Sequence, residues 1–532
     1  MDFIPQASAS RMHLSLRAKK GIDKYPAKAH AQRVGDQLGR EKCIVALVGE
    51  KAEFFSNSDM PRPFRQDRYF YYISGCSEPG CSVTYDVEHD KLTLWLPPIN
   101  LDRVYYDGRG STVEQAMELY DIDEAVYLEH DERSNSNLCD WVNQRKADGC
   151  ECIFIRNPLS GVDLSLYGRE VDRPESPGLT LRKAMNACRA VKDEHEIALI
   201  RKANAVSAEG HVAILKSLHR LHSEPEVEGV YRGTCISLGT TEQSYGPICG
   251  AGEHASQLHY VTNKSQFADA EVLLIDAGAE WECYASDVTR TMPINKHEPG
   301  TWKSKEAKAV YKHVEKIQEK CIAMLRPGVH FMDVMLHSVH MAIDALLDLG
   351  ILKGKHMDIF HDGVSAGFYP HGLGHHIGLE VHDVEPPTIK AQDKEEPWKA
   401  RFADLQQAHA RYVESTGTSL YSAQTTSTEP RHFSIDPTKC LSPSTPADAP
   451  LTPGMVVTIE PGIYFNAFVL ETFYLDHPEH RKYIDRKVLE RYMHVGGVRI
   501  EDDILITKDG YENLTTAPKG EEMLRIIRKG KK

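Results

Sequence analysis

The sequence predicts an α/β (α+β) protein of two mixed domains, and three observations support this fold class. The chain has 532 residues, which at roughly 100–200 residues per domain is enough for two to four domains. In its first third, short strand-like runs alternate with helical patches, as in an α/β domain. Pro and Gly then cluster at residues 174–178, and longer helices and carboxylate-bearing strands follow. We therefore expect a domain boundary near this cluster.

The first domain is expected to contain four strands and at least two helices. The strand-like runs are separated by Gly, Pro, Asn and Asp and cover residues 43–48, 69–73, 83–85 and 92–96. Helical patterns cover residues 111–119 and 137–146. The aromatic-rich run at 64–73 is interpreted as core or as an interface rather than as a binding site. No group of residues in this domain has a catalytic pattern.

Long helices dominate the first part of the second domain. Residues 181–221 form a charged, helical segment with an apolar face, which we expect to lead into this domain. Two further helices, at 307–326 and 331–349, are separated by a Pro-Gly pair that ends one helix before the next begins. Residues 390–450 change in composition, from a charged segment to a Ser/Thr/Pro/Ala-rich run, and are expected to form a partly disordered insertion.

The composition excludes several classes of partner. The formal net charge of −14 argues against a general nucleic-acid or anionic-membrane partner. No apolar run approaches the ~20 residues that span a bilayer, and the basic N-terminal stretch has no apolar core of a secretory signal. The twelve cysteines are scattered without zinc-finger or disulfide-framework spacing. We therefore expect a soluble, cytoplasmic protein with free thiols.

Two aspartates lie in a predicted β-hairpin. Residues 271–277 and 284–292 read as paired strands joined by a turn at 278–281, which places Asp276 opposite Asp287. An aspartate in an apolar strand is expensive to bury unless it is paired or binds a metal. Because two carboxylates that face each other repel, a bound cation is the expected explanation.

The stretch from residue 370 to residue 383 is the second candidate for metal binding. It contains four histidines and two carboxylates, interleaved with three glycines that would each cost a helix roughly 1 kcal/mol. We expect a loop that leads into a strand. Neutral imidazoles bind divalent metals, although a histidine-rich surface loop is an equally good interpretation of this stretch alone. The spacing does not choose between the histidines, which are His371, His375, His376 and His382.

Two glutamates complete the candidate site. Glu460 and Glu501 each stand at the end of a β-rich run. With Asp276, Asp287 and one histidine they form an oxygen-dominated, thiolate-free donor set, which suits hard divalent cations. Four carboxylates bring four negative charges, which two divalent cations neutralise and one does not. Two metals ~3.5–4 Å apart usually activate a water and stabilise an oxyanion, which is hydrolytic chemistry.

Five short motifs occur in order along the chain, at residues 275–278, 286–290, 371–383, 459–462 and 499–502. Together they resemble the pita-bread metallopeptidases, in the aminopeptidase P-like (Xaa-Pro aminopeptidase and prolidase) branch. The resemblance covers most of the chain. It implies an N-terminal tail at 1–20, a creatinase-like (aminopeptidase P N-terminal) domain at 21–178 and a pita-bread catalytic domain at 181–525. The family's connection between the histidine stretch and the Glu-Pro-Gly strand is much shorter than residues 384–454, so the insertion at about 390–450 is atypical.

The resemblance implies a dinuclear metal site. Its ligands would be Asp276, Asp287, His375, Glu460 and Glu501. Asp287 and Glu501 would bridge the metals, and Glu460 would take the proton from the bridging water. Three outer residues would orient the substrate or hold the carboxylates in place, namely His259, His382 and Arg499. Family members commonly use manganese, so two Mn²⁺ ions are expected.

The resemblance also implies a substrate. Proline has no amide N–H and its ring restricts the chain, so peptidases that bind an extended strand handle it poorly. We expect the chain to remove the N-terminal residue from peptides with proline in second position. An Xaa-Pro dipeptidase (prolidase) is the alternative; prolidases bind the dipeptide carboxylate with an arginine, and Arg401, Arg411 and Arg431 lie in the insertion but match no motif.

A methionine aminopeptidase and a metal-free binding module are less favoured. Methionine aminopeptidases share the ligand set but usually lack a large N-terminal domain. Pita-bread proteins that act as metal-free binding modules usually lack several ligands, whereas this sequence retains all five. The expected partners are thus peptide substrates, with no nucleic acid and no membrane. A homodimer is also expected, from the aromatic residues of the N-terminal domain.

Overall fold

The computed structural model describes residues 24–129, 137–155, 177–240, 242–384 and 450–530. The chain divides into two compact units. Unit 1 comprises Met1–Arg189 and Asp193–Ala198, and unit 2 comprises Ala190–Lys192 and Leu199–Lys532. The predicted tail at 1–20 and nearly all of the predicted insertion at 390–450, with its three arginines, lie outside the described residues.

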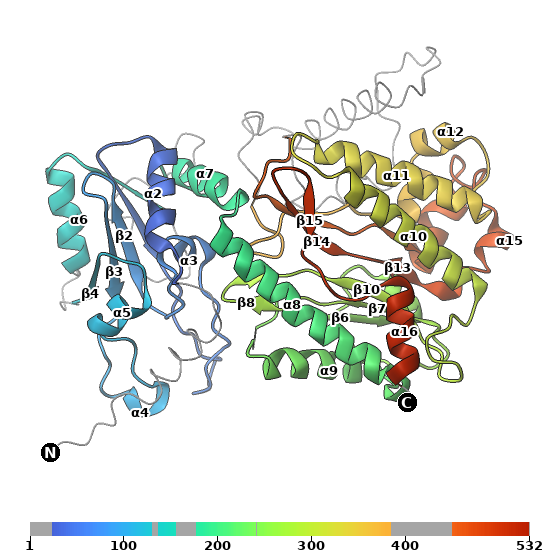
Figure 1. The fold of residues 1–532 in the computed structure, drawn as a ribbon, viewed down its shortest axis with the longest axis horizontal. Coiled ribbons are helices and arrows are strands. Elements are labelled where there is room, and N and C mark those ends of the chain that lie inside the picture. The colour runs from blue at the N-terminus through green and yellow to red at the C-terminus, as the bar shows by residue number, and fades with distance from the viewer. Residues whose placement is uncertain (1–23, 130–136, 156–176, 241, 385–449, 531–532) are drawn as a thin grey trace, which may run out of the picture. The chain divides into compact units, whose positions relative to one another are not determined.

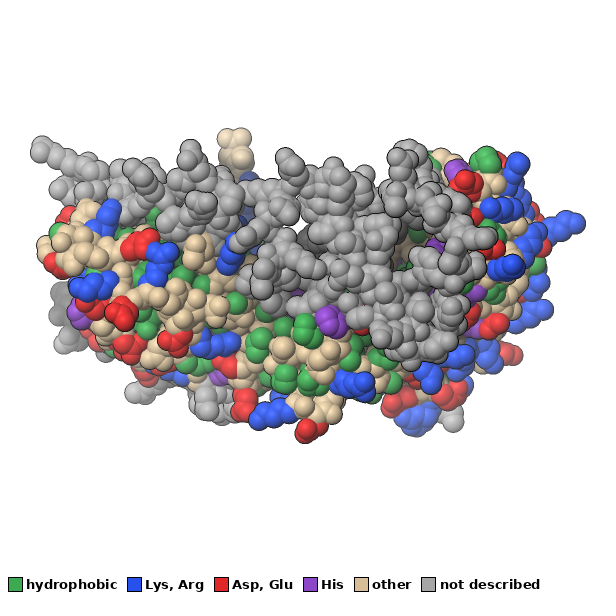
Figure 2. All heavy atoms as spheres, turned by 90° about the horizontal axis from the view of Figure 1, so that it is seen from above, with side chains coloured by type: hydrophobic (Ala, Val, Ile, Leu, Met, Phe, Trp, Pro, Cys, Tyr) green, Lys and Arg blue, Asp and Glu red, His purple; other side chains and the backbone are tan. Residues whose placement is uncertain are grey.

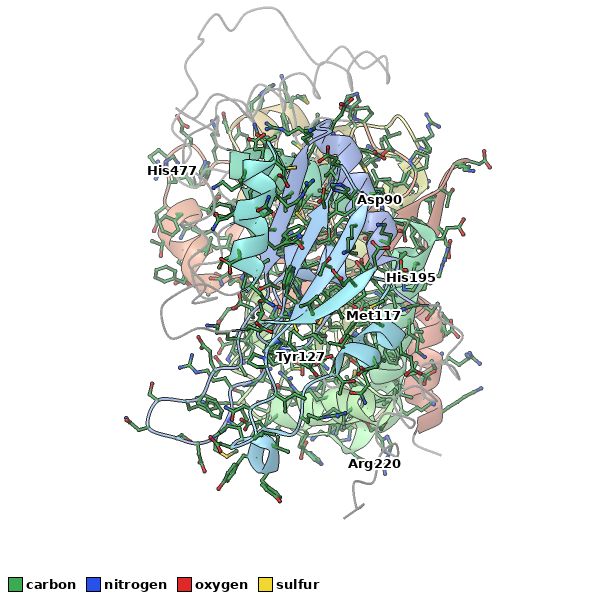
Figure 3. The ribbon with its side chains drawn as sticks, turned by 90° about the vertical axis from the view of Figure 1, so that its left-hand side faces the viewer. Asp90, Met117, Tyr127, His195, Arg220 and His477 are labelled. Atoms are coloured by element: carbon green, nitrogen blue, oxygen red, sulfur yellow. The ribbon has the colours of Figure 1, made fainter. Side chains whose placement is uncertain are left out.

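Unit 1 is built on a five-stranded mixed sheet with the order β4-β3-β2-β1-β5. Its strands are β1 (Cys43–Val48), β2 (Ser82–Asp86), β3 (Lys91–Leu96), β4 (Glu124–Tyr127) and β5 (Glu151–Phe154). The three central strands are antiparallel, whereas β4 and β5 add in parallel at the two edges. Figure 3 looks onto this unit, where the strands lie side by side and Tyr127 marks the edge strand β4. The strands predicted at 43–48, 83–85 and 92–96 are confirmed.

The helices of the N-terminal part are α2 (Ala27–Leu38), α3 (Arg68–Ser74), α4 (Val104–Asp107), α5 (Val113–Leu119), α6 (Asn137–Ala147) and α7 (Pro177–Ala190). The strand predicted at 69–73 is wrong, because these residues form α3. Asp67 caps this helix by accepting a hydrogen bond from the Phe70 N–H, and Gly75 ends it with a left-handed φ of 63°. Phe70, Tyr71 and Tyr72 are buried, so the interpretation of this aromatic run as core is correct.

The strands of unit 2 form four small antiparallel sheets. The first has the order β10-β7-β6, from β6 (Ile248–Ala251), β7 (Val272–Asp276) and β10 (Thr289–Pro293). The second has the order β11-β14-β15, from β11 (Val456–Ile459), β14 (Asp502–Ile506) and β15 (Tyr511–Asn513). The two-stranded sheets pair β12 (Gly462–Tyr464) with β13 (Gly497–Arg499), and β8 (Glu280–Trp281) with β9 (Tyr284–Ala285).

Helices cover these strands. The α-helices are α8 (Glu194–Ser217), α9 (Glu224–Ser237), α10 (Lys305–Met324), α11 (Phe331–Asp348), α12 (His356–His361), α14 (Ala467–Val469), α15 (Arg486–Leu489) and α16 (Gly520–Gly530). Short 3₁₀ or π turns are η2 (Leu218–Arg220), η3 (Gly252–Ser256), η4 (Val364–Gly367), η6 (Leu470–Leu475) and η7 (Met493–Val495). Figure 1 shows α10 and α11 above the strands, α9 below them and α8 running diagonally in front of them.

The predicted helices at 307–326 and 331–349 are confirmed as α10 and α11. They pack on β11 and β14 through one large cluster of buried apolar side chains, which includes Val334, Val457 and Ile504. The segment predicted at 181–221 proves to be two helices, because α7 ends at Ala190 and α8 begins at Glu194. The predicted class of mixed helices and sheets is confirmed.

The predicted aspartate hairpin differs from the structure in register. Strands β7 and β10 pair antiparallel as expected, but Asp276 lies opposite Thr289 rather than Asp287. The connection between β7 and β10 is also longer than the predicted tight turn. It contains the β8–β9 hairpin, which turns at Glu282 and Cys283, both with positive φ (45° and 68°). The prediction of direct cross-strand opposition is therefore wrong by two residues, since Asp287 lies between β9 and β10.

The described surface is mixed in charge. On the face shown in Figure 2, acidic and basic side chains are interspersed rather than gathered into one large field. Among the helices that the structure describes, none has both the length and the apolarity to cross a membrane. The eleven cysteines in the described ranges are free and buried.

Candidate metal centre

The backbone of unit 2 brings strand ends and one loop together. Asp276 is the last residue of β7, and Glu460 directly follows β11. The Glu501 N–H donates to the Thr289 carbonyl at 3.1 Å, which ties the turn between β13 and β14 to the start of β10. The Thr458 N–H of β11 donates to the His375 carbonyl at 2.8 Å. Residues more than two hundred positions apart in the sequence are therefore held side by side by main-chain hydrogen bonds.

Glycine permits the approach of the histidine loop. A Cβ atom at Gly374 would lie 2.0 Å from the Thr458 carbonyl oxygen, so no larger residue fits there. The His375 Nδ1 donates to the His376 carbonyl at 3.1 Å. The Nε2 atom of His375 is thereby turned toward the carboxylates, the arrangement usual for a metal-binding histidine. The stretch forms a loop, as expected, with one bridge from His376 to Val457 of β11.

The side chains of the predicted site converge. The His375 Nε2 lies 3.4 Å from Asp287 Oδ2 and 3.5 Å from Glu460 Oε1. Asp287, His375 and Glu501 each offer a ligand atom, and these three atoms lie within 4.8 Å of one another. Asp276 joins the group through Tyr245, whose hydroxyl contacts Asp276 Oδ1 and lies 2.5 Å from Asp287 Oδ1. The structure thus brings together all five residues that the sequence predicts as ligands.

The carboxylates of the cluster carry a net negative charge that the positively charged groups around them, among the described residues, do not fully balance. Burial, followed by the charges of Asp287 and Glu460, raises the pKa of Glu501 well above its usual value. Burial also raises the pKa of Glu460 to about 7. For His375 burial acts in the opposite direction, but the hydrogen bond to Asp287 and the charge of Glu460 raise its pKa to about 9. These shifts all favour binding of protons, so they mark a site where cations would be stabilised.

One buried atom points to the same need. Glu501 Oε2 accepts a hydrogen bond from Thr289 Oγ1 at 2.6 Å, but Glu501 Oε1 is buried without a hydrogen-bond partner. A buried carboxylate oxygen without a donor is costly unless a cation coordinates it. The donor set of four carboxylates and one imidazole therefore fits divalent metal ions.

Arg499 lies where the predicted carboxylate-holding role requires. Its Nη2 donates to Asp276 Oδ2 at 2.6 Å, its Nη1 donates to Tyr464 Oη at 2.9 Å, and its Nε donates to Thr289 Oγ1 at 3.1 Å. The Tyr464 hydroxyl in turn lies 2.8 Å from His371 Nε2. Arg499 thus fixes one carboxylate and one tyrosine, and the tyrosine fixes a second histidine.

The outer histidines lie on the more exposed side of the cluster. His382 and His259 are exposed, and the His382 ring contacts the His375 ring with centroids 4.3 Å apart. Burial and the Arg499 charge lower the pKa of His371 to about 3. The His371 imidazole is therefore neutral near pH 7, and both of its nitrogens already have partners, the Gly372 carbonyl at Nδ1 and the Tyr464 hydroxyl at Nε2.

Sequence reasoning missed two tyrosines of this site. Tyr245 follows α9 and Tyr464 ends β12. The tertiary fold alone brings their hydroxyls to the cluster. Tyr245 lies 31 residues from Asp276 in the sequence, and Tyr464 lies 35 residues from Arg499. No local spacing marks either residue, although Tyr464 lies four residues after the predicted Glu460.

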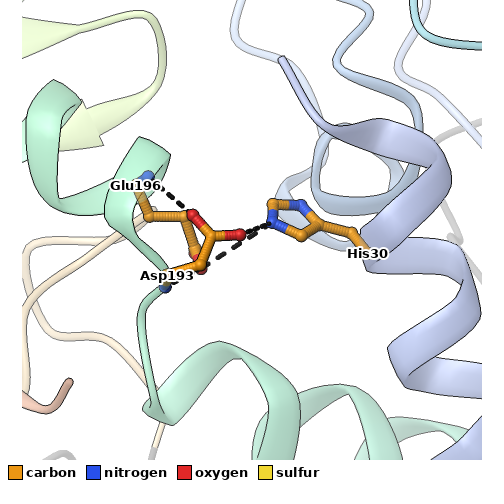
Figure 4. A group of neighbouring side chains, drawn as sticks. All are labelled: His30, Asp193 and Glu196. Carbon is orange, nitrogen blue, oxygen red and sulfur yellow. Dashed lines mark hydrogen bonds and ion pairs between the residues drawn. The ribbon is translucent and has the colours of Figure 1, made fainter. Parts of the chain in front are cut away.

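A second histidine and carboxylate group lies in unit 1 (Figure 4). The His30 Nε2 is 2.7 Å from Asp193 Oδ2 and 3.8 Å from Glu196 Oε2. Here a protein cation is already present, because Arg33 Nη1 lies 3.7 Å and 3.6 Å from the same two oxygens. Asp193 and Glu196 also accept each other's backbone N–H at the start of α8. We interpret this group as a charge-compensated helix cap rather than a metal site.

Comparison with protein families decides the class of the site. Residues 198–508 match the model of metallopeptidase family M24, and residues 27–146 match the model of the aminopeptidase P N-terminal domain. The first match alone covers more than half of the chain. The chain belongs to metallopeptidase family M24. With its N-terminal match, it belongs to the aminopeptidase P-like part of that family, so the resemblance seen in its motifs is confirmed.

Individual M24 proteins are similar over nearly the whole chain. A probable Xaa-Pro aminopeptidase of Pyrenophora tritici-repentis is 44% identical over 519 residues, which are 97% of this chain and 74% of that protein. A probable Xaa-Pro aminopeptidase of Ajellomyces capsulatus is 42% identical over 528 residues, 98% of this chain and 93% of that protein. Among solved structures, aminopeptidase P from E. coli with the inhibitor Pro-Leu has a TM-score of 0.68 at 23% identity, over 95% of this chain and 99% of that one. This M24 chain therefore shares its fold.

Proposed function

We propose that this chain is a metal-dependent Xaa-Pro aminopeptidase, which removes the N-terminal residue from peptides with proline in second position. The convergence of Asp276, Asp287, His375, Glu460 and Glu501 in one buried cluster carries the proposal. The names of the relatives, which are 40–44% identical to this chain over the aligned residues, support the substrate. Methionine aminopeptidase is disfavoured by the aminopeptidase P N-terminal domain.

The five clustered residues are proposed to hold two divalent cations, most simply Mn²⁺. Asp287 and Glu501 would bridge them, in keeping with the buried Oε1 of Glu501, which has no hydrogen-bond partner. Two divalent charges would balance four carboxylates in a site that burial makes unfavourable for bare anions. When bound, such a metal pair supplies Lewis acidity and an activated water at neutral pH.

Glu460 is proposed as the general base. The family resemblance implies this role, and a carboxylate beside a metal-bound water is suited to accept and return a proton. The position beside His375 Nε2, at 3.5 Å, keeps one of its oxygens at the centre of the cluster. Glu460→Gln should therefore lower kcat far more than KM.

The remaining residues are proposed to orient the substrate and the carboxylates. His259 and His382, on the exposed side, would hydrogen-bond the peptide around the scissile bond. Arg499 would hold Asp276 through its 2.6 Å contact, and Tyr245 would hold Asp276 and Asp287 together. Such supporting contacts typically change metal affinity or activity by about 10- to 100-fold when removed.

The decisive test compares two substrates. An Xaa-Pro-Xaa tripeptide and an Xaa-Pro dipeptide are offered side by side, with Mn²⁺ and then with chelator, and release of the N-terminal amino acid is measured. Metal-dependent cleavage of the tripeptide supports the aminopeptidase. Cleavage of the dipeptide alone would make the chain a prolidase instead. If neither peptide is cut while metal is bound, the proposed substrate is wrong.

We also propose a cytoplasmic homodimer. The buried free thiols fit a reducing compartment. The aromatic run at 64–73 lies largely in the core and is not free to form an interface, whereas Phe55, Leu101, Tyr105 and Tyr106 of unit 1 are exposed by 50–96%. Exposed aromatic side chains are enriched at interfaces between proteins. Sedimentation of the wild type and of Tyr105→Glu tests this: a wild-type monomer, or a dimer that the substitution leaves intact, contradicts it.

A further inference from the structure

Lys192 and Asp383 form a buried ion pair in unit 2, apart from the five clustered residues. The Lys192 Nζ donates to Asp383 Oδ2 at 3.1 Å, and each side chain is only 1% exposed. Taking two charges out of water is expensive, and a buried ion pair often adds no more stability than packed apolar side chains of the same size. Stability alone therefore does not account for this pair.

The lysine is held in place on several sides. Its N–H donates to the Gly454 carbonyl at 2.9 Å, and Val191 packs against the apolar core beneath α10 and α11. At Gly378 a Cβ atom would lie 2.7 Å from Lys192 Cε and 2.3 Å from Asp383 Oδ2. Only glycine at this position lets the ion pair lie directly against the backbone of the histidine segment, residues 375–383.

The ion pair fixes the end of the histidine segment. The Asp383 N–H donates to the His376 carbonyl at 2.9 Å, which closes residues 376–383 into a loop. His382 directly precedes Asp383 in this loop and contacts His375 ring to ring, with an interplanar angle of 77°. Because the His382 side chain is exposed, its position depends on how firmly the backbone beside it is held.

We propose that Lys192 is a positioning residue, which holds His382 in register with the metal cluster through Asp383. This inference rests on the proposed function, in which His382 orients the peptide. Lys192 does not touch the substrate. Its charge fixes the carboxylate of Asp383, the carboxylate fixes the backbone, and the backbone places the imidazole. A displacement of 1 Å in such a group can cost about 100-fold in rate.

The first test is a double-mutant cycle on the metal-loaded, full-length chain. Lys192→Met should lower kcat on an Xaa-Pro-Xaa tripeptide by about 10- to 100-fold and change KM by less than about threefold. In a His382→Ala background the same substitution should change kcat by less than about twofold, since there is no longer a side chain to position. An effect of Lys192→Met that is equally large with and without His382 would overturn the proposal.

A second comparison separates positioning from stability. The double variant Lys192→Met/Asp383→Leu replaces the ion pair by apolar side chains and should recover most of the melting temperature that Lys192→Met loses. If Lys192 positions His382, kcat should stay low in this double variant although its stability is recovered. If kcat recovers together with the melting temperature, the pair is merely structural. Arg201→Met, which removes an exposed ion pair with Glu512 in the same unit, is the control and should leave both quantities unchanged.

A third measurement does not need activity. The rate at which diethylpyrocarbonate modifies His382 is followed by mass spectrometry, with His259 as the internal control. Lys192→Met should change the rate at His382 by at least about threefold and leave His259 within about 1.5-fold, in line with a local displacement. An unchanged rate at His382 overturns the proposal. If the wild type cleaves no proline peptide, the proposed function fails, and this rate still decides whether Lys192 positions His382.

Discussion

Replacing Tyr245 by phenylalanine should weaken metal binding by about 10- to 100-fold. The hydroxyl lies 2.5 Å from Asp287 Oδ1 and also contacts Asp276 Oδ1. It can donate one proton, and a hydrogen bond to a charged group contributes about 1.5–3 kcal/mol. Since about 1.4 kcal/mol is a tenfold change in a dissociation constant, this loss corresponds to at least a tenfold weaker site. Supporting residues around metal ligands generally show effects of this size.

The assay is calorimetric titration of metal-free protein with Mn²⁺. Tyr231→Phe is the matched control, because its buried hydroxyl donates to Ser207 Oγ at 3.1 Å or to the Ala277 carbonyl at 3.0 Å, and among the described residues it makes no hydrogen bond to a carboxylate. This control should cost about 1 kcal/mol of stability and leave the dissociation constant unchanged. The reasoning is refuted if Tyr245→Phe binds Mn²⁺ within about twofold of the wild type, or if the control weakens binding equally.

Three further outcomes are expected. Arg499→Lys keeps the charge but loses the planar fork that contacts Asp276 and Tyr464, so kcat/KM on the tripeptide should fall by about 10- to 100-fold; an unchanged value would mean that charge alone suffices. Burial lowers the pKa of His211 to about 3. At a pH between that value and the usual histidine pKa near 6.5, the unfolded chain binds a proton at this residue that the native chain does not bind. The free energy of unfolding should therefore fall by up to about 1.4 kcal/mol per pH unit below 6.5. Urea unfolding at about pH 5 and 6.5 should show a smaller difference for His211→Gln than for the wild type, and an equal difference would contradict this. Chelation should lower the melting temperature, because metal binds the native state alone; an unchanged melting temperature would speak against the metal site.

Local patterns predicted the longest helices and several strands, because the signals for these elements lie within the segments themselves. Helices α10 and α11 have a clear apolar face and a Pro-Gly break between them, and strand β1 is a short β-branched run. The helix α3 was predicted as a strand because Tyr69 to Ile73 is aromatic and apolar throughout, so no periodicity distinguishes the two structures. The deciding signals were its ends, with the Asp67 cap and Gly75 in the left-handed region.

The candidate site was only partly predictable. Carboxylates in apolar strands are anomalous in the sequence itself, which is why Asp276 and Asp287 were found despite a wrong hairpin register. The choice of His375 among four histidines needed the family resemblance. In the structure the reason is geometric, because the His376 carbonyl accepts from Nδ1 and turns Nε2 toward Asp287 and Glu460. Side chains that meet through the tertiary fold alone, such as Tyr245, carried no signal.

Charge compensation accounts for Asp502, and the position of Glu501 beside the other ligands distinguishes it from Asp503. Residues 501–503 are three consecutive acids, and all three are buried. Asp502 has protein cations, since Arg290 and Lys519 contact it at 2.7 Å and 2.6 Å and, against the effect of burial, lower its pKa to about 2. Asp503 accepts hydrogen bonds from the Asn204 amide at 2.7 Å and from the backbone N–H of Asp287 at 3.1 Å. Among the described residues no lysine or arginine lies within ion-pair distance of Glu501. Glu501 and Asp503 each keep one buried oxygen without a hydrogen-bond partner. Glu501 alone of the two has a ligand atom within 4.8 Å of those of Asp287 and His375, and this placement assigns Glu501 to the metal centre.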